Sequence, residues 1–290
     1  MTIPDPAVDV SGAVDLAPDL LVVPNHHVGL VPNIGIIGGT EAVLVVDTGL
    51  GPENARAVFA LADEVARGRR VLLTTTHFHP EHAFGAAAFD GTYVVGRAQA
   101  DDLRRKGSGY LEMFRGFGGA VADRLSGAEV PVPDVVFDGE HVLDLGGRTV
   151  VLRPTGRGHT LGDQVVEVPD AGVLFTGDLA ETGQFAIFPW FPPHDTDVSG
   201  LAWIAVLDRL IASSPRVVVP GHGSVGGIGV LEGVRDYLRE LRDETWRRRD
   251  SAVADIVAEV RAVLVARHPE WVGQEWIEPG VACLCSESAP

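Results

Sequence analysis

The sequence of 290 residues contains few cysteines, and this limits what can hold the chain together. Only Cys283 and Cys285 are present, two residues apart near the C-terminus. This pair cannot form a disulfide framework, which needs several spaced cysteines. A Cys-x-Cys metal site would need thiol partners nearby, and none are present. Hydrophobic residues make up 46% of the chain, which is enough for a sizeable core.

Long apolar runs and an excess of basic residues are also missing. No apolar run approaches the ~20 residues of a membrane-spanning helix, so we expect no membrane partner. The N-terminal residues lack a basic region followed by an apolar one, which favours a cytoplasmic protein over a secreted one. The net charge of -17 disfavours nucleic acid as the main partner, because binding its backbone requires a basic surface. We therefore expect a small-molecule substrate.

Apolar patterns divide the chain into short strands and amphipathic helices. Residues 1–18 are expected to form a poorly ordered arm, and residues 19–290 one domain that ends in helices. Glycines interrupt the helical spacing between residues 97 and 126. Strands and a helix are followed by strands and a helix again, which predicts an α/β fold. We expect an αββα sandwich of two mixed β-sheets flanked by helices. The predicted strands lie near residues 20–23, 35–37, 42–46, 71–73, 92–95, 135–137, 149–152, 164–168, 172–175 and 217–219.

Three histidines and a carboxylate lie within six residues after the apolar run at 71–73. They are His77, His79, Glu81 and His82. Packing alone seldom explains such a density of metal-ligand side chains. The position corresponds to the loop at the end of a buried strand, where the active sites of layered α/β proteins usually lie. The stretch therefore predicts part of a metal site.

Four other polar residues follow predicted strands or glycines in the same way. They are Asp47, His159, Asp178 and His222. Glycines beside them allow the backbone to turn sharply and to approach an ion closely. Asp47 precedes Thr48 and Gly49, so it could equally close a turn. If these residues meet the histidine loop in space, the chain is a metalloenzyme.

The spacing and order of these residues resemble the metallo-β-lactamase fold superfamily, whose signature is His-x-His-x-Asp-His followed by His, Asp and His in separate loops. The resemblance covers residues 20–225 and implies one catalytic domain. It implies that His77, His79 and His159 hold one metal and that Asp178 bridges to a second. Glu81, His82 and His222 would hold that second metal. Asp47 would accept a hydrogen bond from a ligand imidazole and fix its tautomer.

The chain departs from the signature at Glu81, which stands where the family has Asp. Glutamate is one methylene longer, so it could ligate a shifted metal, weaken occupancy of the second site, or lie outside the ligand shell. We favour ligation, because a carboxylate oxygen remains a competent zinc ligand. Two zinc ions are the expected cofactors, with iron or a mixed pair as the alternative.

This ligand set implies hydrolysis by a hydroxide that bridges two metals. Glu81 and Asp178 would orient the hydroxide and pass its proton to the leaving group. The expected substrate is a small-molecule ester, thioester, lactone or amide, β-lactams included. The alternatives are a sulfatase, an iron-dependent oxidoreductase that oxidises persulfides, and a non-catalytic binding module.

Two aromatic stretches are candidates for the substrate pocket. The first contains Tyr110, Phe114 and Phe117, and the second contains Phe188 and Trp190 in a proline-rich segment. The same residues could instead cover a satellite core or form a homodimer contact. A substrate contact by His26 and His27 also stays open, because a glycine loop follows them.

Overall fold

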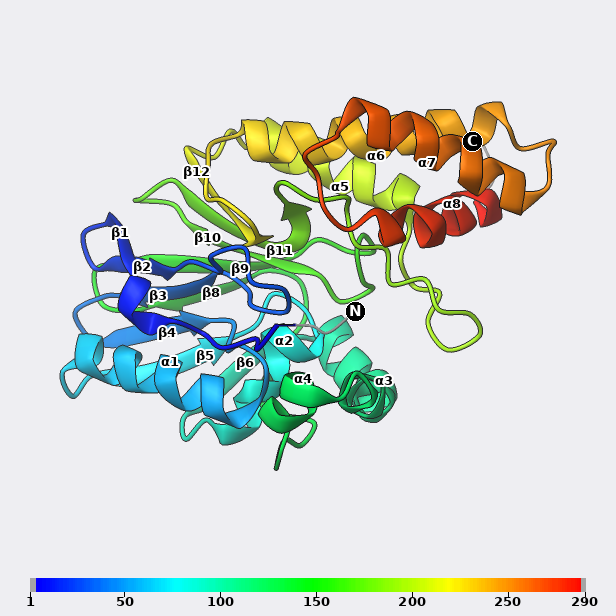
Figure 1. The fold of residues 1–290 in the computed structure, drawn as a ribbon. Helices are drawn as coiled ribbons and strands as arrows, with labels where there is room; N and C mark the ends of the chain where they lie inside the picture. Colours follow the sequence, from blue (N-terminus) through cyan, green and yellow to red (C-terminus); the bar gives the residue numbers. More distant parts are fainter. Residues whose placement is uncertain (1–3, 288–290) are drawn as a thin grey trace.

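The computed structural model describes residues 4–287 and shows two mixed β-sheets packed face to face, with helices on both outer faces (Figure 1). The predicted αββα sandwich is therefore confirmed. Helices from the first half of the chain cover one sheet, and helices from the second half cover the other. Loops from both sheets lie at one shared edge of the sandwich, and the candidate ligand residues are located there.

The first sheet contains seven strands in sequence order. Strands β1 to β4 pair antiparallel, whereas β4 to β7 pair parallel. The carboxyl ends of β4 and β5 therefore meet at one edge. The strands are β1 (Val14–Ala17), β2 (Leu20–Val23), β3 (Ile34–Gly38), β4 (Ala42–Val46), β5 (Arg70–Thr74), β6 (Thr92–Gly96) and β7 (Val135–Phe137).

The second sheet contains five strands in the order β12-β11-β10-β9-β8. Only β11 and β12 pair parallel, so their carboxyl ends also lie side by side. The strands are β8 (His141–Asp144), β9 (Thr149–Pro154), β10 (Gln164–Val168), β11 (Val173–Glu181) and β12 (Val217–His222).

Successive side chains of the central strands enter different cores. In β4, Leu44 and Val46 pack between the sheets, whereas Val43 and Val45 pack beneath the helices of the first sheet. This alternation follows from the two-residue period of a strand. Both faces of the strand are covered, which explains why its residues form a continuous apolar run.

Four helices and two short helical turns belong to the first half. They are α1 (Gly51–Ala66), α2 (Pro80–Ala83), η2 (Phe84–Ala88), α3 (Arg97–Gly116), α4 (Gly119–Arg124) and η1 (Val10–Gly12). Helix α3 continues through Gly107 despite the expected interruption. A Cβ atom at Gly107 would lie 2.5 Å from a methyl of Val130, so close packing requires glycine there.

The second sheet is covered by α5 (Gly200–Ala212), α6 (Gly229–Arg247), α7 (Val253–Arg267), η3 (Gln274–Trp276) and α8 (Ile277–Ser286). Apolar side chains such as Trp203, Leu241 and Leu264 fill the space between these helices and the sheet. Within residues 4–287, no helix combines the length and the apolar character that crossing a membrane requires.

The N-terminal region from residue 4 onward differs from the expected poorly ordered arm. Strand β1 pairs antiparallel with β2, and the amide group of Asn54 donates a 2.8 Å hydrogen bond to the carbonyl of Pro6. The backbone N–H of Val8 in turn donates to the Asn54 side-chain oxygen over 3.0 Å. These long-range contacts tie the segment to α1, and a local sequence pattern does not reveal them. Residues 1–3 of the predicted arm lie outside the described residues.

Candidate metal centre

The histidine loop follows β5 and leads directly into α2. Pro80 lies in the first turn of α2, where its fixed φ and missing N–H are tolerated. The helix therefore begins immediately after His79 and carries Glu81 and His82 on one short turn. All four polar side chains of the loop are buried, each at most 5% exposed.

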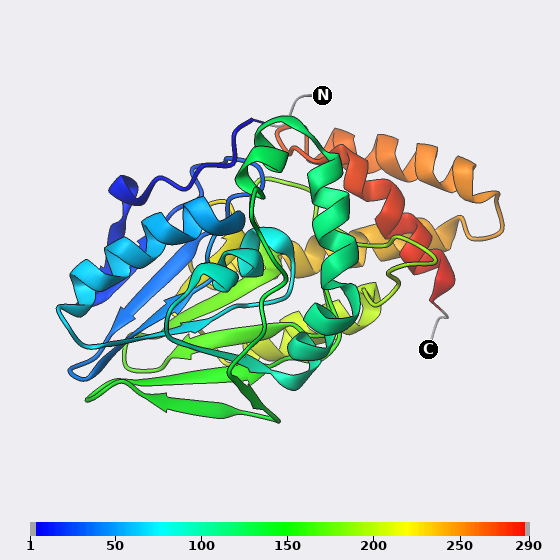
Figure 2. The ribbon, with the colours of Figure 1, turned by 90° about the horizontal axis from the view of Figure 1, so that it is seen from below.

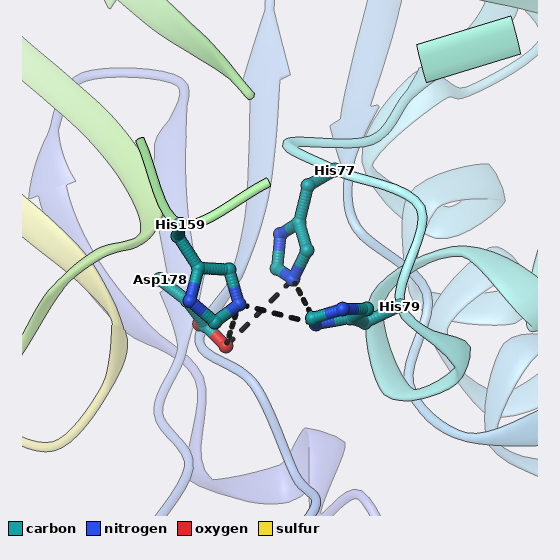
Figure 3. A group of neighbouring side chains, drawn as sticks. All are labelled: His77, His79, His159 and Asp178. Atoms are coloured by element: carbon teal, nitrogen blue, oxygen red, sulfur yellow. Dashed lines mark hydrogen bonds and ion pairs between the residues drawn. The ribbon is translucent and has the colours of Figure 1, made fainter. Parts of the chain in front are cut away.

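Three histidine nitrogens converge in the first ligand group (Figure 3). Nε2 of His77 and Nε2 of His159 each lie 3.1 Å from Nδ1 of His79. A carboxylate oxygen of Asp178 lies 3.7 Å from both Nε2 atoms. One ring nitrogen offers a single lone pair or a single proton, so hydrogen bonds alone cannot satisfy all three nitrogens. A cation in their midst would.

The second ligand group contains Glu81, His82, Asp178 and His222. Nε2 of His82 is 3.2 Å and Nε2 of His222 is 3.6 Å from Oδ1 of Asp178. The ligand atoms of this group lie within 4.8 Å of one another, as do those of the first group. Asp178 belongs to both groups, with one oxygen toward each. All seven residues predicted as metal ligands are thus brought together.

Buried polar atoms without hydrogen bonds test whether these residues fit a pair of cations. Burying such atoms without partners is costly, and cations would remove that cost. The 3.2 Å approach of His82 to Asp178 lacks the geometry of a hydrogen bond. Imidazole and carboxylate are the donors that zinc and iron accept. The donor set fits. Within residues 4–287 the atoms without a hydrogen-bond partner include both oxygens of Asp178, Oε2 of Glu81, and Nε2 of His82 and His222.

Asp47 lies beside the second group without belonging to either group. Its Oδ2 lies 2.9 Å from Nδ1 of His82, and its Oδ1 accepts a 2.7 Å hydrogen bond from the backbone N–H of Thr76. With Nδ1 bound in this way, Nε2 of His82 faces Asp178 as an acceptor or metal ligand. The role of Asp47 in fixing the tautomer of a ligand imidazole stays a prediction.

Gly221 allows β12 to pass directly behind the shared carboxylate. A Cβ atom at this position would lie 1.9 Å from Oδ1 of Asp178, which no side chain could accommodate. The glycine therefore permits His222, the next residue, to reach the second group.

Burial governs the protonation of the ligand histidines. It lowers the pKa of His77, His79 and His222, and it lowers the pKa of His159 to about 4. These four imidazoles are therefore neutral at neutral pH, as metal ligation requires. Burial also raises the pKa of Glu81 to about 7.

His82 differs from the other histidines. Burial acts to lower the pKa of His82, but the carboxylates of Asp178 and Asp47 outweigh it and raise the pKa well above the usual value. In return, despite the opposing effect of burial, charged His82 holds the pKa of Asp178 well below its usual value.

Sequence reasoning missed two residues that hold the ligand loops in place. Glu181 is buried at the end of β11, and its Oε2 accepts a 3.0 Å hydrogen bond from the N–H of Ile187. Asn33 donates hydrogen bonds of 2.9 Å to the carbonyls of Pro220 and Gly223, on both sides of His222. The sequence signal for Glu181 was a charged residue within an apolar stretch. Its hydrogen-bond partner, Ile187, lies in an irregular segment that the sequence pattern does not place.

The candidate pocket aromatics are dispersed. The ring of Tyr110 stacks on the imidazole of His79, with centroids 5.1 Å apart. Phe114 lies behind Tyr110 in the first core, and Phe117 is 49% exposed. Phe188 is fully buried against Trp203, so its expected place in the pocket is corrected to the core. Trp190 packs against the same core.

The two other histidines left open lie in the loop between β2 and β3. His26 and His27 line a cavity of about 310 Å³ together with Gly223, the neighbour of His222. Both adopt a left-handed backbone conformation. A substrate contact by this loop stays a prediction.

Comparison with known proteins places this site in a family. The family profile of the metallo-beta-lactamase superfamily matches residues 27–222, which is more than half of the chain. The chain belongs to the metallo-beta-lactamase superfamily. This membership confirms the predicted resemblance and the predicted class, a metal-dependent hydrolase.

Relatives within the metallo-beta-lactamase superfamily have different activities. The acyl-coenzyme A thioesterase MBLAC2 of Bos taurus is 30% identical over 67% of this chain and 74% of its own length. The metallo-beta-lactamase type 2 of Bacteroides fragilis is 30% identical over 75% and 79%. A solved family protein from Thermus thermophilus covers 93% of both chains, with a TM-score of 0.67 and 17% identity. That likeness includes most of the described fold.

Proposed function

We propose that this protein is a binuclear, zinc-dependent hydrolase that cleaves a small-molecule thioester. One observation carries the proposal: two groups of buried ligands share Asp178. Thioester is chosen from the predicted substrate classes because of the 30% identity to an acyl-coenzyme A thioesterase. A β-lactam is an alternative on the same criterion, because the identity to metallo-beta-lactamase type 2 is also 30%. Oxygen esters and lactones contain the same type of electrophilic carbonyl.

Two divalent cations in these groups would acidify a water molecule and polarise the substrate carbonyl. His77, His79 and His159 would hold the first cation, and Glu81, His82 and His222 the second. Asp178 would contact both, because its two oxygens face different groups. Asp47 would keep His82 in the tautomer that ligation requires.

The side chains of the site also have roles in the hydrolytic step. Carboxylate oxygens of Glu81 and Asp178 without protein hydrogen bonds can orient the attacking water and receive its proton. The water oxygen then forms a bond to the carbonyl carbon, and the carbon–sulfur bond breaks. The proton passes to the sulfur, so the products are a carboxylic acid and a thiol. Water is the only co-reactant.

Elemental analysis and a substrate panel test this proposal together. Protein purified without added metal should contain two zinc ions per chain and should hydrolyse thioesters faster than lactones, β-lactams or sulfate esters. Asp178→Ala should lose at least one zinc equivalent, and turnover should fall by at least about a hundredfold, the upper end of what a change outside the ligand shell costs.

Asp208→Ala is the control, because Asp208 forms a surface ion pair with Arg239 outside both ligand groups. It should retain zinc and turnover. Full turnover in Asp178→Ala would overturn the proposal. One iron ion per chain together with oxidation of a persulfide would establish the alternative oxidoreductase function.

A further inference from the structure

A cavity of about 560 Å³ lies between α3 and the segment at 191–195 that follows β11. Its size is typical of sites for small-molecule groups. Figure 2 shows α3 crossing the molecule, with the segment after β11 passing beside it. The apolar part of the wall comes from Tyr110, Met113 and Phe191, and Gly109 leaves one side open.

The cations of this cavity are already paired with carboxylates. Nζ of Lys106 lies 2.9 Å from Asp195 and 2.7 Å from Asp197. Arg105 forms a 2.9 Å ion pair with Asp102. Counting Glu112 and Asp195 in the wall and the ion-pair partners Asp102 and Asp197 outside it, the two cations are accompanied by four carboxylates. A phosphate or carboxylate of a ligand would therefore meet no uncompensated positive charge here.

Tyr110 contacts both the cavity and one of the ligand histidines. It lines the cavity and also stacks on the imidazole of His79. Its hydroxyl donates a 2.7 Å hydrogen bond to Asp195, the same carboxylate that pairs with Lys106. The ring is therefore held in a fixed position, and the cavity begins one aromatic ring away from His79.

We propose that this cavity binds an uncharged, apolar acyl group of the substrate, and that the absence of a side chain at Gly109 leaves room for it. This inference rests on the proposed function, because the scissile carbonyl must lie at the ligand groups. It further implies that the charged part of the substrate, if there is one, lies outside this cavity.

Filling the cavity at Gly109 tests the inference. A Cβ atom there has no atom within 4 Å, so Gly109→Phe can be introduced without a backbone clash. The control is Gly116→Phe, since Gly116 is also on α3 and equally open but lies outside the cavity wall. Both variants introduce the same side chain on α3, at an interior position for Gly109 and at the last residue of the helix for Gly116.

The readout is hydrolysis of N-acetylcysteamine thioesters with acyl chains of two to ten carbons. In the wild type and in Gly116→Phe, kcat/KM should rise about fourfold for each methylene that enters the cavity. In Gly109→Phe this rise should disappear. Met113→Ala should shift the preference to longer chains. An unchanged chain-length profile in Gly109→Phe would overturn the inference.

Binding of methyl ketones separates this inference from the proposed function, because these ketones contain a carbonyl that hydrolysis cannot cleave. Calorimetry should show tighter binding of decan-2-one than of butan-2-one in the wild type, but not in Gly109→Phe. If this binding pattern holds while no thioester is cleaved, the cavity assignment stands and the proposed reaction fails. If thioesters are cleaved without any chain-length effect on rate or binding, only the cavity assignment fails.

Discussion

Glu181 and His159 are hydrogen-bonded to the same residue, Ile187, through opposite ends of its backbone. The Glu181 carboxylate accepts the N–H of Ile187 over 3.0 Å, and the carbonyl of Ile187 lies 3.0 Å from Nδ1 of His159. This contact fixes Nδ1–H on His159 and directs its Nε2 toward the first ligand group. A carboxylate outside both ligand groups thereby sets the orientation of a ligand.

Replacing Glu181 should therefore weaken the first of the two proposed zinc sites. In Glu181→Ala the N–H of Ile187 loses its acceptor, and we expect zinc affinity to fall about 10–100-fold. Glu181→Gln should restore the affinity, because the amide oxygen can accept the same hydrogen bond. Competition with a chelator measures the affinity, and the visible spectrum of the cobalt-substituted protein reports on the geometry of the site.

The control for Glu181 is Tyr237→Phe. Tyr237 lines the same small cavity as Glu181, and its buried hydroxyl has no hydrogen-bond partner within residues 4–287. The variant should bind zinc like the wild type. Wild-type affinity and an unchanged cobalt spectrum in Glu181→Ala would show that Glu181 does not position His159.

Replacing Asp47 should weaken the second of the two proposed zinc sites. Asp47→Ala removes the acceptor for Nδ1 of His82 and for the N–H of Thr76, so the His82 ring is no longer held toward Asp178. We expect the affinity for the second zinc equivalent to fall about 10–100-fold, with a smaller effect on the first. Calorimetric titration of the metal-free protein resolves the two equivalents.

Asp134→Ala is a matched control for Asp47→Ala. Asp134 also accepts a backbone N–H, that of Tyr93 over 2.8 Å, but it lies outside both ligand groups. Equal losses of both zinc equivalents in Asp47→Ala, or the same loss in Asp134→Ala, would contradict the assignment.

Glu81→Gln should change how the stability of the metal-free protein depends on pH. Burial raises the pKa of Glu81 from 4.5 to about 7, so the folded state retains a proton that the unfolded chain has lost. The wild type therefore loses stability as the pH rises from about 4.5 to 7. At about 1.4 kcal/mol per pH unit, Gln should gain about 3 kcal/mol relative to Glu over this range.

Urea unfolding in the presence of a chelator, between pH 4.5 and 8, measures this difference. The control is Glu129→Gln, because the side chain of Glu129 is exposed and lies outside both ligand groups. A constant difference between wild type and Glu81→Gln would show that burial does not perturb this carboxylate.

The sequence predicted the ligand loops well because each is a local feature. His77 follows the apolar strand β5, while Asp178 and His222 come after the apolar runs that begin β11 and β12, and the ends of parallel strands meet at one edge. The family signature then supplied the grouping of the ligands. The αββα layers followed equally directly from the order of apolar patterns.

Features that depend on distant partners escaped prediction. Phe188 was expected in the pocket, but the apolar surface of Trp203, which buries it, belongs to a helix later in the chain. The ion pairs of Lys106 with Asp195 and Asp197 also join separate segments. Periodicity reports which side chains are buried, but it does not report their partners.

Each ligand group combines two residues from the loop after β5 of the first sheet with two residues from the second sheet and its loops. In the first group His77 and His79 meet His159 and Asp178. In the second group Glu81 and His82 meet Asp178 and His222. Cations bound there would crosslink the two halves of the sandwich through their ligands. Separating the halves would require the loss of coordination at both cations, so part of the free energy of metal binding adds to the free energy of unfolding. Chelation should therefore loosen the contact between the sheets before it disturbs either sheet alone.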